Sequence, residues 1–267
     1  MVDKGLDTQG IKEVEITRIR EKQKSREKDF LVREVPLTIF LNGQEFVTLL
    51  CSPEKLNYLA VGFLRLEGLL KCSEDLQEIA VDTEAGKVFV RVKMPPDQPK
   101  KMYGPRAVTA RLGKGTLFAQ SLHLLQGRRV ESALQVKAAE LFALMAVLQK
   151  TSVLFKKTGG VHTAALAVAD KILFYSEDIG RHNAIDKIVG ECILKNIPFG
   201  DKILLSSGRV SSEIIIKVAK LGLPMIVSRS APTSLSVELA AKMGITLVGF
   251  VRGRRLNVYT HENRIFL

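Results

Sequence analysis

The sequence predicts an α/β fold with a smaller, β-rich region at its N-terminus. In the C-terminal half, short apolar runs of strand length alternate with amphipathic helical patterns. This alternation is typical of a largely parallel sheet that helices cover on both faces. The N-terminal part shows hairpin patterns instead, and a stretch at 95–106 with four of the nine prolines follows it. We therefore predict an N-terminal α+β domain at 1–105 and an α/β domain at 106–267 that carries the ligand site.

The N-terminal part begins with a strand and a strong hairpin signal. The stretch 12–19, "KEVEITRI", predicts a short strand, whereas the charged stretch 20–30 is interpreted as a solvated turn or a frayed segment. The stretch 36–50, "PLTIFLNGQEFVTLL", predicts a hairpin. Asn42 and Gly43 favour the positive φ angles that a tight turn needs between two apolar runs.

A helix is predicted directly after this hairpin. Ser52 is suited to cap it, Pro53 fits its first position, and Gly68 ends it. A second hairpin, "QEIAVDTEAGKVFVRVKM", is predicted at 77–94.

The C-terminal part begins with a long amphipathic helix at 131–149, followed by a strand pair at 164–176 that turns near Asp170. The next helix, 183–196, has apolar residues at the i, i+3, i+4 spacing of one buried face. The remaining predicted elements are a strand at 201–206, a helix at 211–222, a strand at 224–228, a helix at 234–244 and strands at 245–250 and 256–260.

The charge balance and the cysteines narrow the functional classes. The chain has 40 Lys and Arg against 28 Asp and Glu, and this net charge of +12 favours an anionic partner. It shows neither the ~20 consecutive apolar residues of a membrane span nor the apolar segment of a secretory signal. Its three cysteines are scattered, which indicates a reducing compartment without a disulfide framework. We therefore expect a cytoplasmic protein with no membrane partner and no zinc site.

Polar residues gather directly after four of the predicted strands. Each of these turns carries at least one arginine, beginning with Arg181, Arg209, Arg229 and Arg252 in the four turns. Ligands of open α/β sheets bind beyond the carboxyl ends of the strands, so we expect the four turns to form one cluster. Helix N-termini carry partial positive charge, and arginine matches phosphate oxygens. The sequence therefore predicts a site for a phosphorylated or otherwise polyanionic ligand.

Several residue types in these turns have simpler interpretations as well. A Ser or Asn before a helix is commonly only a cap, and an arginine beside an aspartate is commonly a structural ion pair. His162 is either a site residue or a structural histidine. The residues that we predict to line the site, besides those after the last strand, are His162, Asp178, Arg181, His182, Asn183, Ser207, Gly208, Arg209, Ser212, Glu213, Arg229 and Ser230.

Long stretches of the chain resemble the FdhD family, the formate dehydrogenase accessory sulfurtransferases. They span most of 36–265 and are unusual in composition, so the resemblance is specific. The stretches are "CSPEKLNYLAVGFLRLEG" (51–68), "TGGVHTAAL" (158–166), "EDIGRHNAIDKIVG" (177–190), "LSSGRVSSEIIIKVAKLGLPMIVSRSAPTSLSVELA" (205–240) and "GITLVGFVRGRRLNVYTHENRI" (244–265).

The resemblance implies a three-layer α/β/α domain like that of cytidine deaminases, without the deaminase zinc ligands, beside a smaller β-rich domain. It also implies a cytoplasmic homodimer that binds the molybdenum cofactor as its bis(molybdopterin guanine dinucleotide), with guanosine diphosphate (GDP) as a fragment ligand. A cysteine desulfurase would supply sulfur for the metal centre before the cofactor enters formate dehydrogenase. The segment matching the family's cofactor-binding position is Phe250, Val251, Arg252, Gly253, Arg254 and Arg255.

The chain departs from the family at the sulfur-carrying loop. Members carry a CxxC-type motif there, whereas the matching stretch 108–120, "VTARLGKGTLFAQ", has no cysteine. A persulfide requires a thiolate. Three alternatives remain open: a cofactor chaperone only, which we favour; another thiol as substitute; or sulfur transfer without a covalent step. The weak candidate thiol is Cys51, since a helix N-terminus after it would lower its pKa; a buried structural thiol is the competing interpretation.

Two other functional classes compete with this one. A nucleic-acid-binding module fits the net charge, but aromatic residues make up only 6% of the chain, and arginines in turns favour a pocket. A hydrolytic or deaminating enzyme would need an activated water, and the sequence lacks the motifs that supply one.

Overall fold

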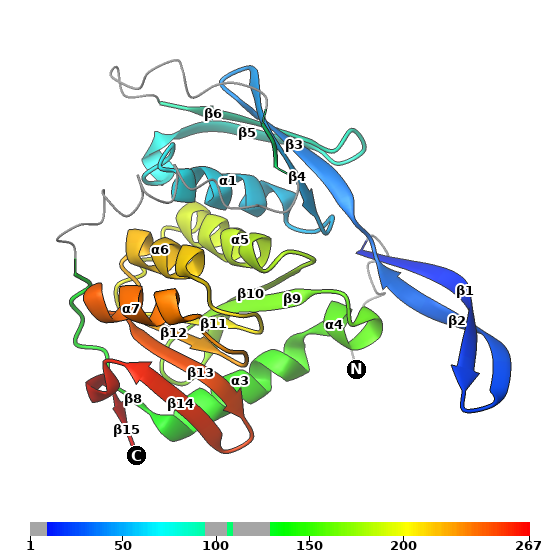
Figure 1. Cartoon of the computed structure of the whole chain (residues 1–267). Coiled ribbons are helices and arrows are strands. Elements are labelled where there is room, and N and C mark those ends of the chain that lie inside the picture. Colours follow the sequence, from blue (N-terminus) through cyan, green and yellow to red (C-terminus); the bar gives the residue numbers. More distant parts are fainter. Residues whose placement is uncertain (1–9, 94–105, 109–128) are drawn as a thin grey trace, which may run out of the picture.

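The computed structural model of the chain describes residues 10–93, 106–108 and 129–267 (Figure 1). The predicted α/β class is confirmed, and a six-stranded sheet forms the centre of the C-terminal part. Its strands, in spatial order, are β10 (Ile172–Asp178), β9 (His162–Ala167), β11 (Ile203–Ser206), β12 (Met225–Ser228), β13 (Thr246–Arg252) and β14 (Arg255–Thr260).

The sheet is mixed, so the prediction of a largely parallel sheet was wrong. Only β11–β12 and β12–β13 pair in parallel, while β9 is antiparallel to both of its neighbours and β14 is antiparallel to β13. Because β10 and β11 both oppose β9, the strands β10, β11, β12 and β13 all point the same way. Their carboxyl ends therefore meet at one edge of the sheet, together with the start of β9.

Helices lie on both faces of this sheet (Figure 1). Alternate residues of the strands enter two separate apolar clusters: Leu204 joins the cluster under α5 and α6, and Leu205 joins the cluster under α3. This two-sided burial explains why the strands are almost continuously apolar. The likeness to cytidine deaminases stays a prediction. The helices are α3 (Ala138–Thr151), α4 (Val153–Thr158), α5 (Arg181–Leu194), α6 (Ser212–Leu221) and α7 (Ser234–Lys242).

The N-terminal part contains a five-stranded sheet and one helix. The predicted hairpin at 36–50 is confirmed: β3 and β4 pair in antiparallel fashion, with φ of 49° at Asn42 and 83° at Gly43 in the turn. The second predicted hairpin is also confirmed, as β5 and β6. In spatial order the strands are β5 (Leu76–Asp82), β6 (Lys87–Val92), β3 (Val35–Leu41), β4 (Gln44–Cys51) and β7 (Arg106–Val108).

The helix after this hairpin, α1 (Leu56–Glu67), begins later than predicted. Lys55 in the left-handed conformation precedes it, so the predicted cap at Ser52 and first position at Pro53 were wrong. Ser52 instead forms hydrogen bonds with Glu177 and Asp178 of the C-terminal part. Gly68 ends the helix as predicted, with φ of 82°.

Helix α1 packs against α5 and joins the two parts of the chain (Figure 1). The helices cross at Gly62 and Gly190, where a Cβ on either residue would lie within 2 Å of the other helix's backbone: 1.8 Å from the Asp186 oxygen and 1.9 Å from the Tyr58 oxygen, respectively. One apolar cluster runs through both parts. The boundary at residue 105 stays a prediction, and β7 beyond it adds to the N-terminal sheet.

A long hairpin, β1 (Ile11–Arg20) with β2 (Gln23–Val32), projects from the body (Figure 1). The strands pair at all ten positions, so the interpretation of 20–30 as a turn or frayed segment was wrong.

Helix α3 also begins seven residues later than predicted, because the chain before it is extended. Two short strands, β8 (Val136–Lys137) and β15 (Ile265–Phe266), pair there, and 3-10 turns occur at Ser73–Asp75 and Glu262–Arg264. Within the described ranges, no helix has the length and apolarity to cross a bilayer.

Candidate functional site

The polar turns meet at the edge where the four codirectional strands end. His162, which opens β9, pairs in register with Asp178, which ends β10, and Ser206 at the end of β11 pairs with Ser228 at the end of β12. This topology explains why residues far apart in the sequence lie together.

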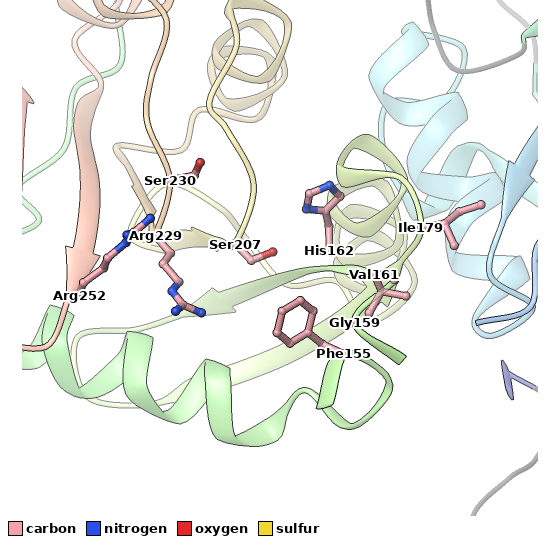
Figure 2. A pocket seen from close by; sticks show the side chains of 10 residues that line it. Phe155, Gly159, Val161, His162, Ile179, Ser207, Arg229, Ser230 and Arg252 are labelled. Atoms are coloured by element: carbon pink, nitrogen blue, oxygen red, sulfur yellow. The ribbon is translucent and has the colours of Figure 1, made fainter. Parts of the chain in front are cut away.

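The first of two cavities at this edge, which we call the arginine hollow, has a volume of about 460 Å³. That volume lies within the usual range for small-ligand pockets. Figure 2 shows Arg229 and Arg252 on the side of β12 and β13, and Phe155 on the side of α4. The lining residues are Phe155, Gly159, Gly160, Val161, His162, Ile179, Ser207, Arg229, Ser230 and Arg252.

The second cavity, which we call the junction hollow, adjoins the first along Gly160, His162 and Ile179. Its volume is about 660 Å³, and it lies between the N-terminal sheet, α1 and the start of α5. Its remaining lining residues are Val32, Glu34, Leu49, Leu50, Phe63, Gly180, Arg181, His182, Asn183 and Asp186.

The charge of this edge is positive and incompletely neutralised. Burial, and then the positive charge of Arg181 and of Arg209, lower the pKa of His162 below its ordinary 6.5, although Asp178 opposes the shift. The shift favours the neutral form of the ring. The buried Nε of Arg181 has no hydrogen-bond partner within the described part of the chain. An anion bound here would offset the positive charge of the arginines, and an anion that reached Nε of Arg181 would supply its missing acceptor.

Glycine at position 208 permits the close approach of these groups. A Cβ there would lie 3.2 Å from Cβ of Arg181 and 3.3 Å from Nδ1 of His162. Next to it, Ser207 Oγ accepts a hydrogen bond from the Thr163 N–H (2.9 Å), so the hydroxyl proton remains available to a ligand oxygen.

Asp178 fixes the turn that leads into α5. Its Oδ2 lies 2.6 Å from Lys187 Nζ. The same oxygen accepts two hydrogen bonds from Ser52, one from its backbone N–H (3.1 Å) and one from its hydroxyl (3.2 Å). Its Oδ1 accepts hydrogen bonds from the N–H of Gly180 and from Nδ2 of Asn183, both at 2.9 Å. Asp178 is fully buried. The carboxylate therefore ties the turn to the N-terminal part rather than facing a cavity.

The neighbouring carboxylate, Glu177, holds the start of α4. It accepts hydrogen bonds from the N–H groups of Leu154 (3.2 Å) and Phe155 (3.1 Å) and from the hydroxyl of Ser152. The acidic residues of this turn thus fix local structure, and within the described part of the chain neither of them forms an ion pair with Arg181, Arg209, Arg229 or Arg252.

The predicted site residues are only partly brought together. His162, Ser207, Arg229, Ser230 and Arg252 line the arginine hollow, while Arg181, His182 and Asn183 line the junction hollow with His162. Glu213 lies 3.4 Å from His182, and Arg209 is exposed but near enough to His162 to affect its pKa. Among the described residues, those predicted at the site that line neither hollow are Asp178, Gly208, Arg209, Ser212, Glu213, Phe250, Val251, Gly253, Arg254 and Arg255.

The residues at the end of β13, 250–255, have different structural roles. Val251 is buried in the core, and Gly253 forms the β13–β14 turn with φ of 59°. Phe250 has φ of 53°, which is unusual for an aromatic residue, at an irregularity in the pairing of β13 with β14. Such irregularities re-aim side chains, and here Arg252 lines the hollow. Sequence reasoning missed Phe155, Val161 and Ile179, because apolar lining residues carry no chemical signature.

A model of the FdhD/NarQ family matches residues 32–266. The chain belongs to the FdhD/NarQ family. It is 39% identical to the sulfur carrier protein FdhD of Bacillus subtilis, over 94% of this chain and 96% of that protein. It is 42% identical to the sulfur carrier protein FdhD of Listeria monocytogenes, over 87% of this chain and 90% of that protein. A solved structure of a candidate formate dehydrogenase accessory protein from Desulfotalea psychrophila superposes with a TM-score of 0.81, at 27% identity, over 96% of this chain and 100% of that one.

The thiols of this FdhD/NarQ member are poor nucleophiles. Burial and the negative charge of Asp178 raise the pKa of Cys51 to about 12, and burial raises that of Cys192 to about 12. Because α1 begins at Leu56, no helix N-terminus directly follows Cys51, and the predicted lowering of its pKa was wrong. Cys72 is exposed, and a hydrogen bond with Glu74 raises its pKa. The loop stretch 109–120 lies outside the described residues.

Thiol labelling in the native protein should reach Cys72 alone. Cys51 and Cys192 are buried and protonated at mildly alkaline pH, so a disulfide reagent such as DTNB should label one thiol per native chain. All three should react after unfolding. The variant Cys72→Ser should show no native labelling, and rapid labelling of Cys51 in it would contradict this description of the buried thiols.

Proposed function

We propose that this chain is an accessory protein of formate dehydrogenase maturation that holds the molybdenum bis(molybdopterin guanine dinucleotide) cofactor by its phosphates. Family membership supports the accessory role, since relatives and a similar structure carry sulfur-carrier and formate dehydrogenase accessory names. The single observation that carries the binding proposal is the arginine hollow, in which two guanidinium groups and two serine hydroxyls from three strand ends line one cavity.

The donor set of this cavity fits a pyrophosphate-bearing ligand. Arg229 and Arg252 offer the planar fork that matches phosphate oxygens, and Ser207 and Ser230 offer hydroxyl donors. In the adjoining junction hollow, the buried Nε of Arg181 has no hydrogen-bond partner among the described residues, and a ligand that extends into that hollow would supply one. When bound, the cofactor supplies the molybdenum centre that receives sulfur. The chain's own residues bind and orient its phosphates.

The sulfur step in this proposal does not form a persulfide on the chain. The matching loop stretch contains no cysteine, two thiols are buried with strongly raised pKa values, and Cys72 lines neither described hollow. We therefore propose a cytoplasmic cofactor chaperone, active as a homodimer, that presents the metal centre to sulfur from a cysteine desulfurase and then delivers the cofactor to formate dehydrogenase.

Calorimetry with GDP tests the binding proposal. We expect the wild-type protein to bind GDP in the micromolar range, and Arg229→Glu to weaken binding by at least about thirtyfold, since reversal replaces a charged hydrogen-bond donor by a repelling carboxylate. The matched control is Arg91→Glu on β6, because the Arg91 side chain is 67% exposed and lines neither hollow. It should change the affinity by no more than about twofold, because salt screens exposed distant charges.

Two outcomes would contradict the binding proposal. Well-folded wild-type protein that binds no guanine nucleotide would exclude it. Salt-dependent binding of mixed-sequence RNA or DNA that GDP does not compete with, and that both reversals weaken equally, would support the nucleic-acid alternative.

Complementation of a host that lacks its own accessory protein tests the cysteine-independent role. We expect the wild-type chain and the variant Cys51→Ala/Cys72→Ala/Cys192→Ala to restore formate dehydrogenase activity to a similar level, because none of the three thiols forms the sulfur-carrying group. Rescue by the wild type alone, with both proteins equally abundant, would show that a thiol of this chain is required.

A further inference from the structure

The wall of the arginine hollow includes an aromatic side chain, Phe155, that cannot bind a phosphate. Phe155 is 45% exposed and contributes its ring to the cavity that Arg229 and Arg252 line (Figure 2). Single exposed apolar residues are ordinary on protein surfaces. A phenyl ring inside a hollow lined by guanidinium and hydroxyl groups is a different case, because ligand pockets combine an apolar wall with a few convergent polar groups.

The backbone of Phe155 is held from both sides. Its N–H donates to Glu177 Oε1 at 3.1 Å, and its carbonyl accepts a hydrogen bond from the N–H of Gly159 at 2.8 Å. Glu177 lies near the end of β10, and Gly159 takes a left-handed conformation, with φ of 66°, that ends α4. Because these hydrogen bonds fix the backbone of the turn, a ligand that packs on the ring does not have to order the turn first.

The hollow is therefore divided into an aromatic and a cationic side. Phe155 comes from α4, whereas Arg229, Ser230 and Arg252 come from the ends of β12 and β13 (Figure 2). A nucleotide has the same division, because its base is a planar ring and its phosphates are anionic.

We propose that the face of Phe155 is the platform on which the guanine ring of the bound nucleotide stacks, while Arg229 and Arg252 hold its phosphates. This inference rests on the proposed function and adds the residue that binds the base. Stacking on an aromatic ring is tolerant of base identity, so Phe155 contributes affinity for the nucleotide over bare pyrophosphate rather than discrimination between purines.

The comparison of two ligands in three variants tests this assignment. We expect Phe155→Leu to weaken GDP binding by roughly tenfold to a hundredfold, and pyrophosphate binding by no more than about twofold, because only GDP carries a ring. Phe155→Tyr keeps the aromatic face and should bind GDP like the wild type. The matched control is Val153→Ala: Val153 lies on the same helix with 42% exposure but lines neither hollow, and its loss should leave both affinities unchanged.

An optical measurement gives an independent readout. The chain contains no tryptophan, so Phe155→Trp places the single tryptophan of the variant at the platform, where its emission is excited selectively over that of the tyrosines. Saturating GDP should quench or shift its emission, whereas saturating pyrophosphate should leave it largely unchanged.

The possible outcomes separate this inference from the proposed function. Two results would exclude the platform and leave the phosphate site in place, provided that the wild-type protein binds GDP. In the first, Phe155→Leu binds GDP as tightly as the wild type; in the second, its affinities for GDP and for pyrophosphate fall by the same factor. Unchanged tryptophan emission of the Phe155→Trp variant at full GDP occupancy would also exclude the platform. If the wild type binds neither ligand, the proposed function itself fails.

Discussion

Replacing Gly62 or Gly190 by alanine is expected to lower the free energy of unfolding by about 3 kcal/mol or more. The added Cβ would lie 1.8 Å from the Asp186 backbone oxygen in the first variant and 1.9 Å from the Tyr58 backbone oxygen in the second. Both contacts are with backbone, which cannot rotate away as a side chain would. The helices α1 and α5 would therefore have to separate, and the junction hollow between the two parts would change shape.

Urea unfolding followed by circular dichroism measures this effect. The control is Gly200→Ala, because a Cβ at Gly200 meets no atom within 4 Å and its backbone needs no positive φ. It should change the free energy of unfolding by less than about 0.5 kcal/mol. Equal unfolding midpoints for Gly62→Ala and Gly200→Ala would contradict the close crossing of α1 and α5.

The second large effect is expected at Lys187, whose side chain is 1% exposed and whose ammonium faces the fully buried Asp178 at 2.6 Å. Lys187→Met should destabilise the protein by about 3–5 kcal/mol, because it leaves a buried carboxylate without its counter-charge. It also removes the hydrogen bond to Ser52 Oγ (2.8 Å), and with it a tie between the two parts of the chain.

A double-mutant cycle separates the ion pair from ordinary packing. Asp178→Asn added to Lys187→Met removes the uncompensated charge, so the double variant should be more stable than the sum of the single losses predicts. The control is Lys28→Met, since that lysine pairs with Glu13 at 2.7 Å but is 69% exposed, and its loss should cost at most about 1 kcal/mol. Strictly additive losses at positions 178 and 187 would contradict a coupled buried pair.

Much of the fold could be predicted because the signals were local. The turn at Asn42 and Gly43, the amphipathic helices of the C-terminal half and the polar turns after four strands are all encoded within short stretches. These turns meet at one edge because the strands that precede them, β10, β11, β12 and β13, point the same way. They share this direction although the sheet is mixed, since the antiparallel β9 lies between β10 and β11.

The features that could not be predicted depend on contacts that local composition does not reveal, several of them between residues distant in sequence. Strand β2 is highly charged, and only its pairing with β1 makes it a strand. Helix α4 is short, and its start is fixed by Glu177, more than twenty residues away. Asp178 was predicted to contact the ligand, and its position cannot be inferred without knowing that Ser52 and Lys187 reach it.

Arginine modification with phenylglyoxal, with and without saturating GDP and mapped by mass spectrometry, tests the central claim most directly. The claim is that side chains from separate strand ends form one site for nucleotide phosphates. It predicts that GDP protects Arg229 and Arg252 from modification and leaves the exposed Arg91 as reactive as before. Unchanged reactivity of Arg229 and Arg252 at full GDP occupancy would contradict the claim.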